Sequence, residues 1–581
     1  MEKEKLQMSR HSLAHVLAKA IKNIFPEAKM AIGPSIDDGF YYDFDFDAGF
    51  KMEDAIKIEK EMKSILNKNE QFKRVEVSKE EAKKLFADNP YKLELIEDLN
   101  DGEISVYYLG DDFYDLCAGP HVESTSKLQN FGFKINRING AYWRGSEKNK
   151  MLQRIYVYAF PTSKELGEYI KQVEEALKRD HNKLGRELEL FTTSPMVGQG
   201  LPIMLPKGAK VLQILQRFVE DEEAKRGYLL TMTPYMTKKD LFITSGHWDH
   251  YKDGMFLLGD QDDDDCMCLR PMTCPFQYQA YLNRTRSYKD LPLRYNETSK
   301  LFRKEASGEM HGLIRVSQFT LSEGHIMCTP EQLRDEFASC VDLARFMLKT
   351  LGLYEDVSYR FSKWDENDKE KYIGTKEEWE EVQNTMRSIL DDMGIDYFEA
   401  DGEAAFYGPK LDIQIKNVFG KEDTLITVQI DFQSAKRFGM EYTDKDGIKK
   451  NPYVVHRSSI GCYERTLALL IEKYAGALPV WLSSTQIMVM NVSEVSEDYA
   501  NSVYDALVSK GYRVEKDTRS EKIGYKIREA VTNKIPYMVI LGENESNKKL
   551  VSIRKRGNIN ISDISIQELC DMVDADIQNK I

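Results

Sequence analysis

Residues 302–325 read FRKEASGEMHGLIRVSQFTLSEGH, and they carry the strongest structural signal in the chain. Arg303 is followed two residues later by Glu305, and a segment with serine and glycine leads to Arg315. Arginine forms charge-assisted, bidentate bonds with phosphates and carboxylates, so this spacing fits an anion-binding loop. Arginines alone indicate little, because salt-bridged surface arginines are far commoner than ligand-binding ones.

Two further stretches extend this pattern in both directions along the chain. Upstream, GYLLTMTP (227–234) reads as a strand that ends at Pro234. Downstream, SSIGCYERTLAL (458–469) places Arg465 at the start of a helix-like apolar run. Three features thus follow one another along the chain: a strand that ends at proline, a loop with two arginines, and a glycine before a helix that carries an arginine. This order is more specific than any one of the three features.

Composition limits the class of protein. A chain of 581 residues is too long for a single core, so we expect three or four domains. With 42% hydrophobic and 30% charged residues the chain fits a soluble globular protein. No apolar run approaches the roughly 20 residues that span a bilayer, and MEKEKLQMSR lacks the apolar core of a signal peptide. We therefore expect a cytoplasmic protein without a membrane partner.

Cysteine content and charge exclude two further classes. Eight cysteines without regular spacing argue against a disulfide scaffold. The net charge of −14 argues against a nucleic-acid coat protein. A nucleic-acid partner stays open, because the basic stretch KKLVSIRKRG (548–557) supplies a local patch.

Patterning along the chain predicts its organisation. Residues 1–163 mix helix and strand signals, and residues 164–189 have the mixed charge and helical spacing of a connecting helix. Residues 190–482 contain strands interrupted by Gly/Pro-bearing loops, for example LITVQIDF (425–432). From 483 to 581 strands and helices alternate, which predicts a small α/β domain with a largely parallel sheet.

Four possible metal ligands lie in two short motifs near the N-terminus. SRHSLAH (9–15) contains His11 and His15, and their spacing puts them on one side of a helix. CAGPH (117–121) contains Cys117 and His121, which Gly-Pro separates and which therefore project from a turn. A zinc site, a catalytic site and a coincidence of two patterns all stay open on spacing alone.

Taken together, these segments resemble motifs one, two and three of class II aminoacyl-tRNA synthetases. Over almost the whole chain the resemblance is to the threonyl-tRNA synthetase family, of the bacterial type. The matching stretches of the central region are SGHWDHYKDGMF, LRPMTCP, LPLRYNE, HGLIRV, FYGPKLDI, VQIDF and HRSSIGCYER. HSLAH, IGPSIDDGFYYDFD, CAGPH and GAYWRGSEKNKMLQRIY resemble the family's editing region, and KIGYKIREA and YMVILGENE its anticodon-binding domain.

The resemblance implies an α+β multidomain fold. It would comprise an α+β editing domain over 1–163, a linker helix over 164–189, a class II antiparallel-sheet catalytic domain over 190–482 and an α/β anticodon-binding domain over 483–581. Typical bacterial members carry a small ubiquitin-like domain before the editing region, whereas HSLAH begins here at residue 11. We therefore expect a member that lacks this domain, and the sequence leaves open whether the absence is natural.

The implied reaction is the ATP-dependent ligation of threonine to its tRNA. Arg303 would hold the ATP α-phosphate and the amino-acid carboxylate, and Arg465 the γ-phosphate, with adenine stacked between Arg465 and Phe319. Glu305 would contact the adenine, and Arg315 would be a third cation. With Mg²⁺ these groups would stabilise an in-line displacement at the α-phosphate. His247 would help deprotonate the tRNA 2′/3′ hydroxyl, and a satisfied loop histidine is the alternative.

The resemblance also implies one Zn²⁺ per subunit, held by Cys274, His325 and His456. Three protein ligands leave an open position, which is the arrangement of a working site. A hydrocarbon pocket separates the near-isosteres threonine and valine only about 10²-fold, whereas zinc can bind the threonine amino group and hydroxyl together. A rival cysteine site at Cys266 and Cys268 is weaker, because strand alternation explains that pair.

Other residues resemble the family's amino-acid pocket, with two departures. Gln429 and Tyr407 match residues that line the pocket. Many members have Gln and Asp where this chain has Leu321 and Glu323. Glu323 would replace an aspartate that positions the threonine hydroxyl, with a longer reach, whereas Leu321 cannot form a hydrogen bond.

Serine keeps both zinc-binding groups and lacks only a methyl group, so a second, hydrolytic site is needed. The resemblance places this editing site at His11, His15, Cys117 and His121, with Asp115 and Lys92 as further candidates. We expect it to work through ordered water and not through a bound metal.

At the C-terminus, Arg554 and Glu545 match the family's anticodon readers. Lys522, Lys526 and Arg528 would contact phosphates or face solvent. Class II membership also implies a homodimer through motif one around Pro234. Two alternatives are a catalytically weak RNA-binding paralogue, and an amino-acid ligase for a carrier other than tRNA. Intact arginines and zinc ligands argue against the first, and the anticodon-type domain argues against the second.

Overall fold

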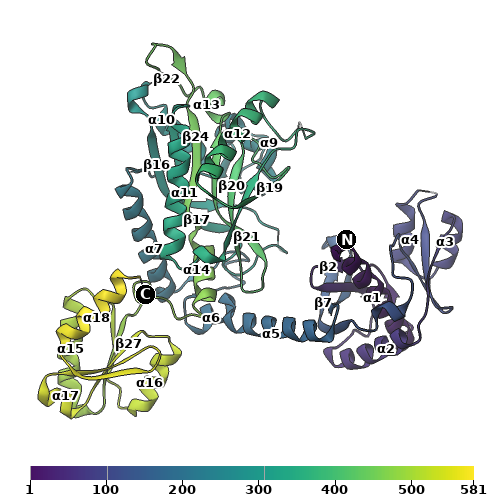
Figure 1. The fold of residues 1–581 in the computed structure, drawn as a ribbon, viewed down its shortest axis with the longest axis horizontal. Helices are drawn as coiled ribbons and strands as arrows, with labels where there is room; N and C mark the ends of the chain where they lie inside the picture. Colours follow the sequence, from purple (N-terminus) through teal and green to yellow (C-terminus); the bar gives the residue numbers. More distant parts are fainter. Residues whose placement is uncertain (1, 101, 307, 369, 581) are drawn as a thin grey trace. The chain divides into compact units, whose positions relative to one another are not determined.

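The computed structural model describes residues 2–100, 102–306, 308–368 and 370–580. By its internal contacts the chain divides into two compact units, Met1–Glu175 and Ala176–Ile581 (Figure 1). None of the helices in the described ranges is long and apolar enough to cross a membrane.

The first unit is built on an antiparallel sheet with the order β1-β3-β8-β7, in which β2 pairs with β3. These strands are β1 (Lys29–Met30), β2 (Ser35–Ile36), β3 (Gly39–Asp45), β7 (Gly132–Tyr142) and β8 (Met151–Phe160). Helices α1 (Glu2–Ile24) and α2 (Ala55–Asn67) pack on each other, and α1 also packs on β3. The helix α1 is buried over most of residues 10–21, so His15 is held in the core, while His11 is partly buried.

A smaller sheet with the order β4-β5-β6 completes this unit. Its elements are β4 (Phe72–Glu76), β5 (Ser105–Leu109), β6 (Phe113–Leu116), α3 (Lys79–Leu85) and α4 (Pro90–Glu97). Asn89 caps α4 by accepting from the backbone of Tyr91 and Lys92, and Pro90 provides the first helical position. This cap fixes the start of the helix that carries the buried Lys92.

The second unit contains a large sheet with the order β11-β16-β17-β24-β21-β20-β18-β19. The strands are β11 (Leu229–Leu230), β16 (Leu293–Phe302), β17 (Gln318–Cys328), β18 (Val357–Ser362), β19 (Tyr397–Ala400), β20 (Lys410–Lys416), β21 (Glu422–Asp431) and β24 (Tyr453–Cys462). The neighbouring pairs from β16 to β18 are antiparallel, as a class II core requires. The strand expected over 425–432 is confirmed as part of β21.

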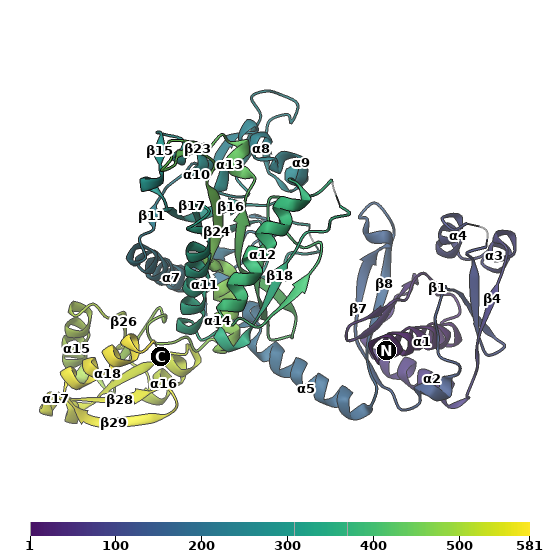
Figure 2. The same cartoon turned by 45° about the horizontal axis from the view of Figure 1, so that its top comes forward.

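Helices cover the sheet and form the main hydrophobic core with it. Helices α7 (Pro206–Lys225), α11 (Leu333–Thr350) and α14 (Tyr463–Lys473) contact the central strands (Figure 2). Helix α12 (Lys376–Asp392) packs on α11 and brings the fully buried Trp379 into this core. Shorter α-helices of this region include α8 (Asp240–Ser245), α9 (His247–Tyr251), α10 (Cys274–Tyr281) and α13 (Ser434–Arg437).

Short strands surround the large sheet. They form the pairings β9 (Phe191–Thr192) with β10 (Ile203–Met204), β12 (Met236–Lys238) and β13 (Leu257–Leu258) with β14 (Met267–Leu269), and β22 (Tyr442–Thr443) with β15 (Arg286–Ser287) and β23 (Lys449–Lys450). Cys268 lies on β14, and Cys266 precedes the strand by one residue. This placement agrees with the strand interpretation of the cysteine pair.

The C-terminal sheet is less parallel than expected. Strands β25 (Ile487–Asn491), β26 (Val514–Asp517) and β27 (Tyr537–Leu541) pair in parallel, as predicted. Strands β28 (Val551–Lys555) and β29 (Ile559–Ile564) then add antiparallel pairs. The basic stretch 548–557 contains β28, in which Val551 and Ile553 alternate inward between polar residues. Helices α15 (Glu497–Ser509), α16 (Ile523–Thr532), α17 (Glu543–Lys548) and α18 (Ile566–Gln578) flank this sheet.

The prediction of a single connecting helix over 164–189 is wrong in one respect, because the segment forms two helices. They are α5 (Ser163–Arg179) and α6 (His181–Glu187). Asp180 adopts ψ 125° between them, and its carboxylate accepts from the backbone N–H of Lys183. An N-cap aspartate in extended geometry starts a new helix, so the chain changes direction there.

Candidate functional site

A cavity of about 240 Å³ opens beside strands β17, β21 and β24. The residues that line it include most of those predicted for ATP and threonine: Arg303, Glu305, Arg315, Phe319, Glu323, His456 and Arg465. Leu321, Leu425 and Cys462 give it an apolar side. Residues that are far apart in the sequence therefore share one cavity.

Four arginines line this cavity, and the three predicted for ATP reach it from three different segments. Arg303 follows β16, and its guanidinium lies 5.2 Å from the ring centre of Phe319. Arg315 pairs with Glu305 at 2.8 Å and with Glu309 at 3.0 Å. Arg465, in the first turn of α14, donates to the carbonyl oxygen of Ile314 at 2.9 Å. Such a concentration of cations fits a polyanionic ligand.

Cys274, His325 and His456 form a buried cluster at the inner end of the site. Their ligand atoms all lie within 4.8 Å of one another. Cys274 is the first residue of α10, whereas the two histidines stand directly opposite each other on β17 and β24. Their rings are 4.6 Å apart. The structure thus brings the three predicted zinc ligands together.

Hydrogen bonds leave one nitrogen of each histidine available. His325 donates from Nδ1 to Gln277 at 2.5 Å, and its Nε2 is buried without a partner among the described residues. His456 donates from Nε2 to Asp431 at 3.0 Å, so its Nδ1 remains. Outer partners of this kind fix the tautomer of a metal-binding histidine, and an orphaned buried nitrogen is costly unless a ligand meets it. The cluster therefore fits a metal ion.

Burial favours the neutral forms of His325 and Cys274. Burial lowers the pKa of His325 well below its usual value, so the imidazole is neutral and able to coordinate. Burial raises the pKa of Cys274 well above its usual value. A cation at the cluster would offset that cost and favour the thiolate.

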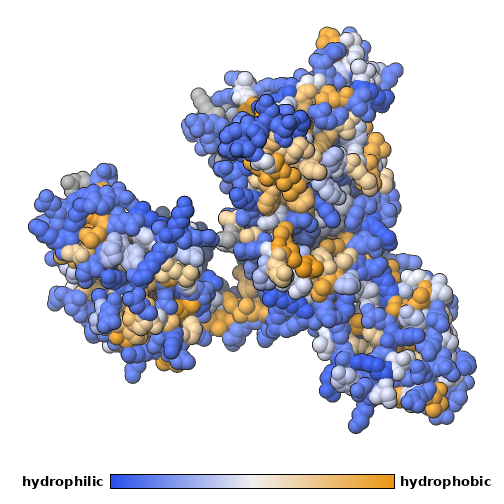
Figure 3. Space-filling view, turned by 180° about the vertical axis from the view of Figure 1, so that it is seen from behind, coloured by the Kyte–Doolittle hydropathy of each residue, from blue (hydrophilic) through white to orange (hydrophobic). Residues whose placement is uncertain are grey.

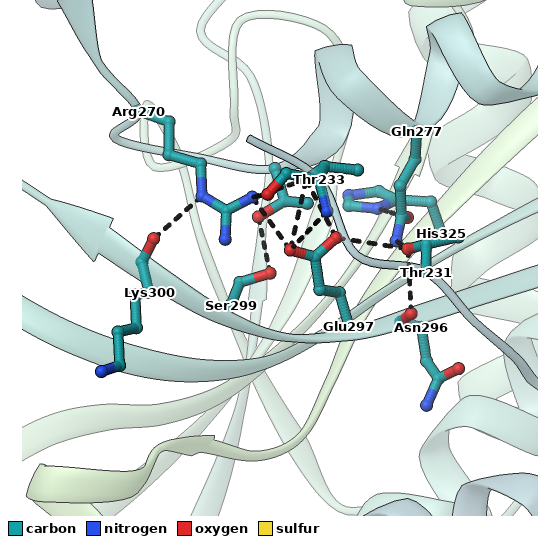
Figure 4. Close-up of polar contacts among 10 residues, drawn as sticks. Thr231, Thr233, Arg270, Gln277, Asn296, Glu297, Ser299, Lys300 and His325 are labelled. Atoms are coloured by element: carbon teal, nitrogen blue, oxygen red, sulfur yellow. Dashed lines mark hydrogen bonds and ion pairs between the residues drawn. The ribbon is translucent and has the colours of Figure 1, made fainter. Parts of the chain in front are cut away.

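A buried polar network behind His325 was not predicted from the sequence. Gln277 donates to Thr231 at 2.7 Å, and Thr231 donates to Glu297 at 3.2 Å (Figure 4). Glu297 forms an ion pair with the fully buried Arg270 at 2.9 Å. The network joins the segment around Pro234 to the metal cluster. Only the position of Gln277, three residues after Cys274 on one helix, could have indicated it.

The amino-acid pocket residues adjoin the cluster. Tyr407 donates to Gln429 at 2.5 Å, and its ring stacks on His456 at 5.0 Å. Glu323 has one oxygen 3.6 Å from His325 Nε2, and its other oxygen is buried without a partner in the described structure. Burial raises the pKa of Glu323. An unpaired acceptor beside a metal cluster suits a ligand that brings a hydroxyl or ammonium group.

His247 lies at the same end of the site. It begins α9, and its Nδ1 lies 2.8 Å from the hydroxyl of Ser245. Burial, with a smaller contribution from His456, lowers the pKa of His247 to about 3. The imidazole is therefore neutral at pH 7.

A second cluster lies in the first unit. His11 Nε2 lies 3.0 Å from the Cys117 sulfur, which lies 3.3 Å from His121 Nε2. The ligand atoms of His11, His15, Cys117 and His121 all lie within 4.8 Å of one another. The α1 helix presents the two histidines on one side, and Cys117 and His121 follow β6 in a non-helical segment, as predicted. Burial raises the pKa of Cys117 to about 11, so its thiol is neutral.

Charged residues support this second cluster. Lys92 and Asp115 form a buried ion pair at 2.6 Å, and Asp115 also lies 3.8 Å from His15. Tyr42, which was not predicted, donates to Asp115 at 2.5 Å. Tyr42 lies on β3 and is buried, and no motif in the sequence indicated its contact with Asp115. The two weaker candidates thus belong to the same polar core as the histidines.

The anticodon candidates lie on β28, next to the edge strand β29, and on α17. Arg554 on β28 donates to Asn558 at 2.6 Å. Glu545 on α17 accepts from the backbone of Gly542 and from Ser552. The expectation for Lys526 was wrong: it is buried, and its ammonium donates to Asn491 and to the carbonyl oxygen of Asp517. Carbonyl acceptors around the amine make burial of this lysine possible.

Comparisons with known proteins cover the same regions. Three family models match: the tRNA synthetase class II core domain (G, H, P, S and T) over 256–474, an anticodon binding domain over 486–576, and the threonyl and alanyl tRNA synthetase second additional domain over 104–156.

Similar sequences and solved structures agree with these family models. The threonine–tRNA ligase of Clostridium perfringens strain 13 is 59% identical over 96% of this chain and 86% of its own length. That of Geobacillus kaustophilus is 46% identical over 99% of this chain and 88% of its own. The RNA binding domain of threonyl-tRNA synthetase from Cryptosporidium parvum Iowa II is 33% identical, with a TM-score of 0.64, and covers 68% of this chain and 98% of that one.

Proposed function

Because the chain belongs to the threonyl-tRNA synthetase family, we propose that it activates threonine with ATP and transfers it to threonine tRNA. One observation carries this proposal: three arginines and a buried Cys-His-His cluster line or adjoin a single cavity. The arginines supply a polyanion site, and the cluster supplies a site for a small amino acid next to it.

The chain's own groups account for the activation step. Arg303, beside Phe319, would hold the α-phosphate and the threonine carboxylate, while Arg465 would hold the γ-phosphate. Cations placed in advance stabilise the charge that develops as the carboxylate attacks phosphorus and pyrophosphate leaves. Mg²⁺ that arrives with ATP would add to this charge. His247, neutral and buried, would accept the proton of the tRNA hydroxyl in the transfer step.

The Cys-His-His cluster fits Zn²⁺. Cys274, His325 and His456 would hold it, with Gln277 and Asp431 as outer partners. Zn²⁺ in this position would coordinate the threonine amino group and hydroxyl together, which valine cannot match. Glu323, Gln429 and Tyr407 would surround the bound amino acid.

The activity is tested by charging purified tRNA. We expect ATP–pyrophosphate exchange that depends on threonine, and formation of threonyl-tRNA from threonine tRNA. Exchange without transfer to tRNA would favour a ligase for another carrier. Binding of tRNA without exchange would favour the RNA-binding paralogue.

Metal analysis tests the number of zinc sites. We expect one zinc per chain after purification and dialysis, because burial and three protein ligands favour retention of the ion at Cys274, His325 and His456. The His11 cluster has similar ligand spacing and is expected to remain free of metal. Two zinc ions per chain, the second lost on mutation of His11, would contradict this assignment.

The first unit would remove serine from mischarged tRNA. His11, His15, Cys117 and His121, with Asp115 and Lys92, form a compact polar pocket with neutral imidazoles and a neutral thiol. Such groups can orient a water molecule toward an ester carbonyl without a metal. In the C-terminal region, Arg554 and Glu545 would read anticodon bases through hydrogen bonds to base edges.

We also propose a homodimer through the segment around Pro234. Met232 is 89% exposed, and Leu229, Leu230, Tyr235 and Met236 are each at least half exposed. Figure 3 shows hydrophobic patches on the face of the larger unit that it presents. Clustered exposed apolar side chains on a short edge strand are typical of a surface that a partner covers.

A further inference from the structure

His181 is a buried histidine that neither site described above uses. It is the first residue of α6 and has no exposed surface. Its Nδ1 lies 2.7 Å from the carboxylate of Glu472, and its Nε2 lies 3.2 Å from the backbone nitrogen of Leu313. One imidazole therefore joins the connecting segment, the loop before β17 and the last turn of α14.

The partners fix the tautomer of this imidazole. The backbone N–H of Leu313 can only donate, so Nε2 must carry a lone pair. The ring proton is then on Nδ1 and is donated to the Glu472 carboxylate. His181 is thus an acceptor toward the loop and a donor toward α14, and no other neutral arrangement satisfies both contacts.

The loop that His181 holds is the one that carries Arg315. Its backbone passes so close that a side chain at Gly312 would meet His181 Nε2 at 2.2 Å and Asn182 at 2.3 Å. Gly312 also has φ +50°, which disfavours other residues. The next residue, Leu313, is fully buried in the main core. The loop therefore packs closely against α6 and is also hydrogen-bonded to it.

The helix at the other end of the contact carries Arg465. Helix α14 begins at Tyr463, and Glu472 lies in its last turn. Arg465 in its first turn bonds to the carbonyl oxygen of Ile314, in the same loop. Arg315 and Arg465, both assigned to ATP, thus lie on the loop and on α14, and the side chain of His181 contacts both of these segments.

We propose that His181 is a positioning residue for ATP, which holds the loop over 311–315, and with it Arg315, in the place that the triphosphate needs, while its contact with Glu472 fixes the tautomer that accepts from Leu313. This inference rests on the proposed assignment of Arg315 and Arg465 to ATP. It goes beyond that assignment because His181 neither lines the cavity nor belongs to the Cys274 cluster; the group of possible ligands that it forms with Asp180 and His311 lies outside both.

Two substitutions separate the two hydrogen bonds of His181. In His181→Gln the amide oxygen can take the place of Nε2 and accept from Leu313, but the donor to Glu472 is lost. In His181→Asn the amide nitrogen can take the place of Nδ1 and donate to Glu472, but the acceptor for Leu313 is lost. The pair is matched, because each variant is a neutral amide that keeps one contact.

We expect His181→Asn to raise the KM for ATP about fivefold in threonine-dependent pyrophosphate exchange, which corresponds to the net loss of one hydrogen bond. The KM for threonine should stay near the wild-type value. His181→Gln should keep the KM for ATP but lower the melting temperature more, since one oxygen of the buried Glu472 loses its 2.7 Å partner while the other keeps only the long contact of 3.4 Å from the Val418 backbone. A merely structural role predicts instead that the KM for ATP follows the melting temperature in both variants.

Hydrogen exchange of peptides over 308–316 gives a readout that does not depend on activity. Exchange should be faster in His181→Asn and close to wild type in His181→Gln. If His181→Asn fails to fold, Gly312→Ala tests the same contact from the loop side and should raise both the exchange rate and the KM for ATP. Unchanged hydrogen exchange over 308–316, together with an unchanged KM for ATP, in the folded variants would overturn the proposal. If the wild-type protein shows no threonine-dependent pyrophosphate exchange, the proposed function is rejected. Hydrogen exchange over 308–316 would still test the contact between His181 and the loop.

Discussion

Replacing Cys274 by serine should lower threonine-dependent ATP–pyrophosphate exchange by more than about 100-fold. Loss of an outer partner of a metal ligand typically costs 10- to 100-fold, and Cys274 is a proposed ligand itself. A serine hydroxyl stays protonated near neutral pH and binds zinc weakly. The zinc content should fall with the activity, and excess zinc should restore little of either.

Cys268→Ser provides the matched control for this substitution. Cys268 is fully buried like Cys274, but it lies on β14 and outside the metal cluster. Both changes place a hydroxyl where a buried thiol was, so a general effect on stability would appear in both. We expect Cys268→Ser to keep its zinc and most of its exchange activity. Near-normal ATP–pyrophosphate exchange in Cys274→Ser would contradict the zinc assignment.

Replacing His11 or Cys117 by alanine should cause seryl-tRNA to accumulate without loss of threonine activation. The synthetic site alone distinguishes serine from threonine by the packing of one methyl group, which is worth about 10- to 200-fold. At equal amino-acid concentrations we therefore expect roughly one seryl-tRNA for every 10 to 200 threonyl-tRNAs. The wild-type protein should hydrolyse pre-formed seryl-tRNA, and each variant should leave it intact.

Lys22→Ala is the control on the same helix. Lys22 is partly exposed near the end of α1, and its ammonium donates to the carbonyl oxygen of Pro26 at 2.8 Å, away from the His11 cluster. Its substitution should leave the hydrolysis of seryl-tRNA at the wild-type rate. Clearance of seryl-tRNA at a normal rate in both His11→Ala and Cys117→Ala would rule out the editing role.

Local motifs in the sequence predicted which residues form the sites, but not how the residues meet. His325 and His456 were identified one by one, whereas their direct opposition across β17 and β24 depends on strand register. Register arises from pairing between segments far apart in the chain, which spacing within one segment cannot reveal. The same reason explains why the links from His325 through Gln277 and Thr231 to Glu297 were not foreseen.

One error came from treating charge as a sign of exposure. Lys526 was expected at the surface and is buried, because carbonyl and amide oxygens surround its amine. In the basic stretch 548–557, by contrast, every lysine and arginine is at least partly exposed. Val551 and Ile553 are the buried residues of that stretch, in the alternation typical of a strand.

The opposed histidines on β17 and β24 also bear on how the protein folds. A slip of one residue between these strands would turn one imidazole to the other face of the sheet and break the cluster. A bulge between Leu321 and Glu323 already shifts the pairing of these strands, because the partner on β24 changes from Cys462 to Ser458. An ion that binds Cys274, His325 and His456 together would stabilise the correct alignment selectively. Zinc supply during synthesis would then affect the yield of native protein as well as its choice of amino acid.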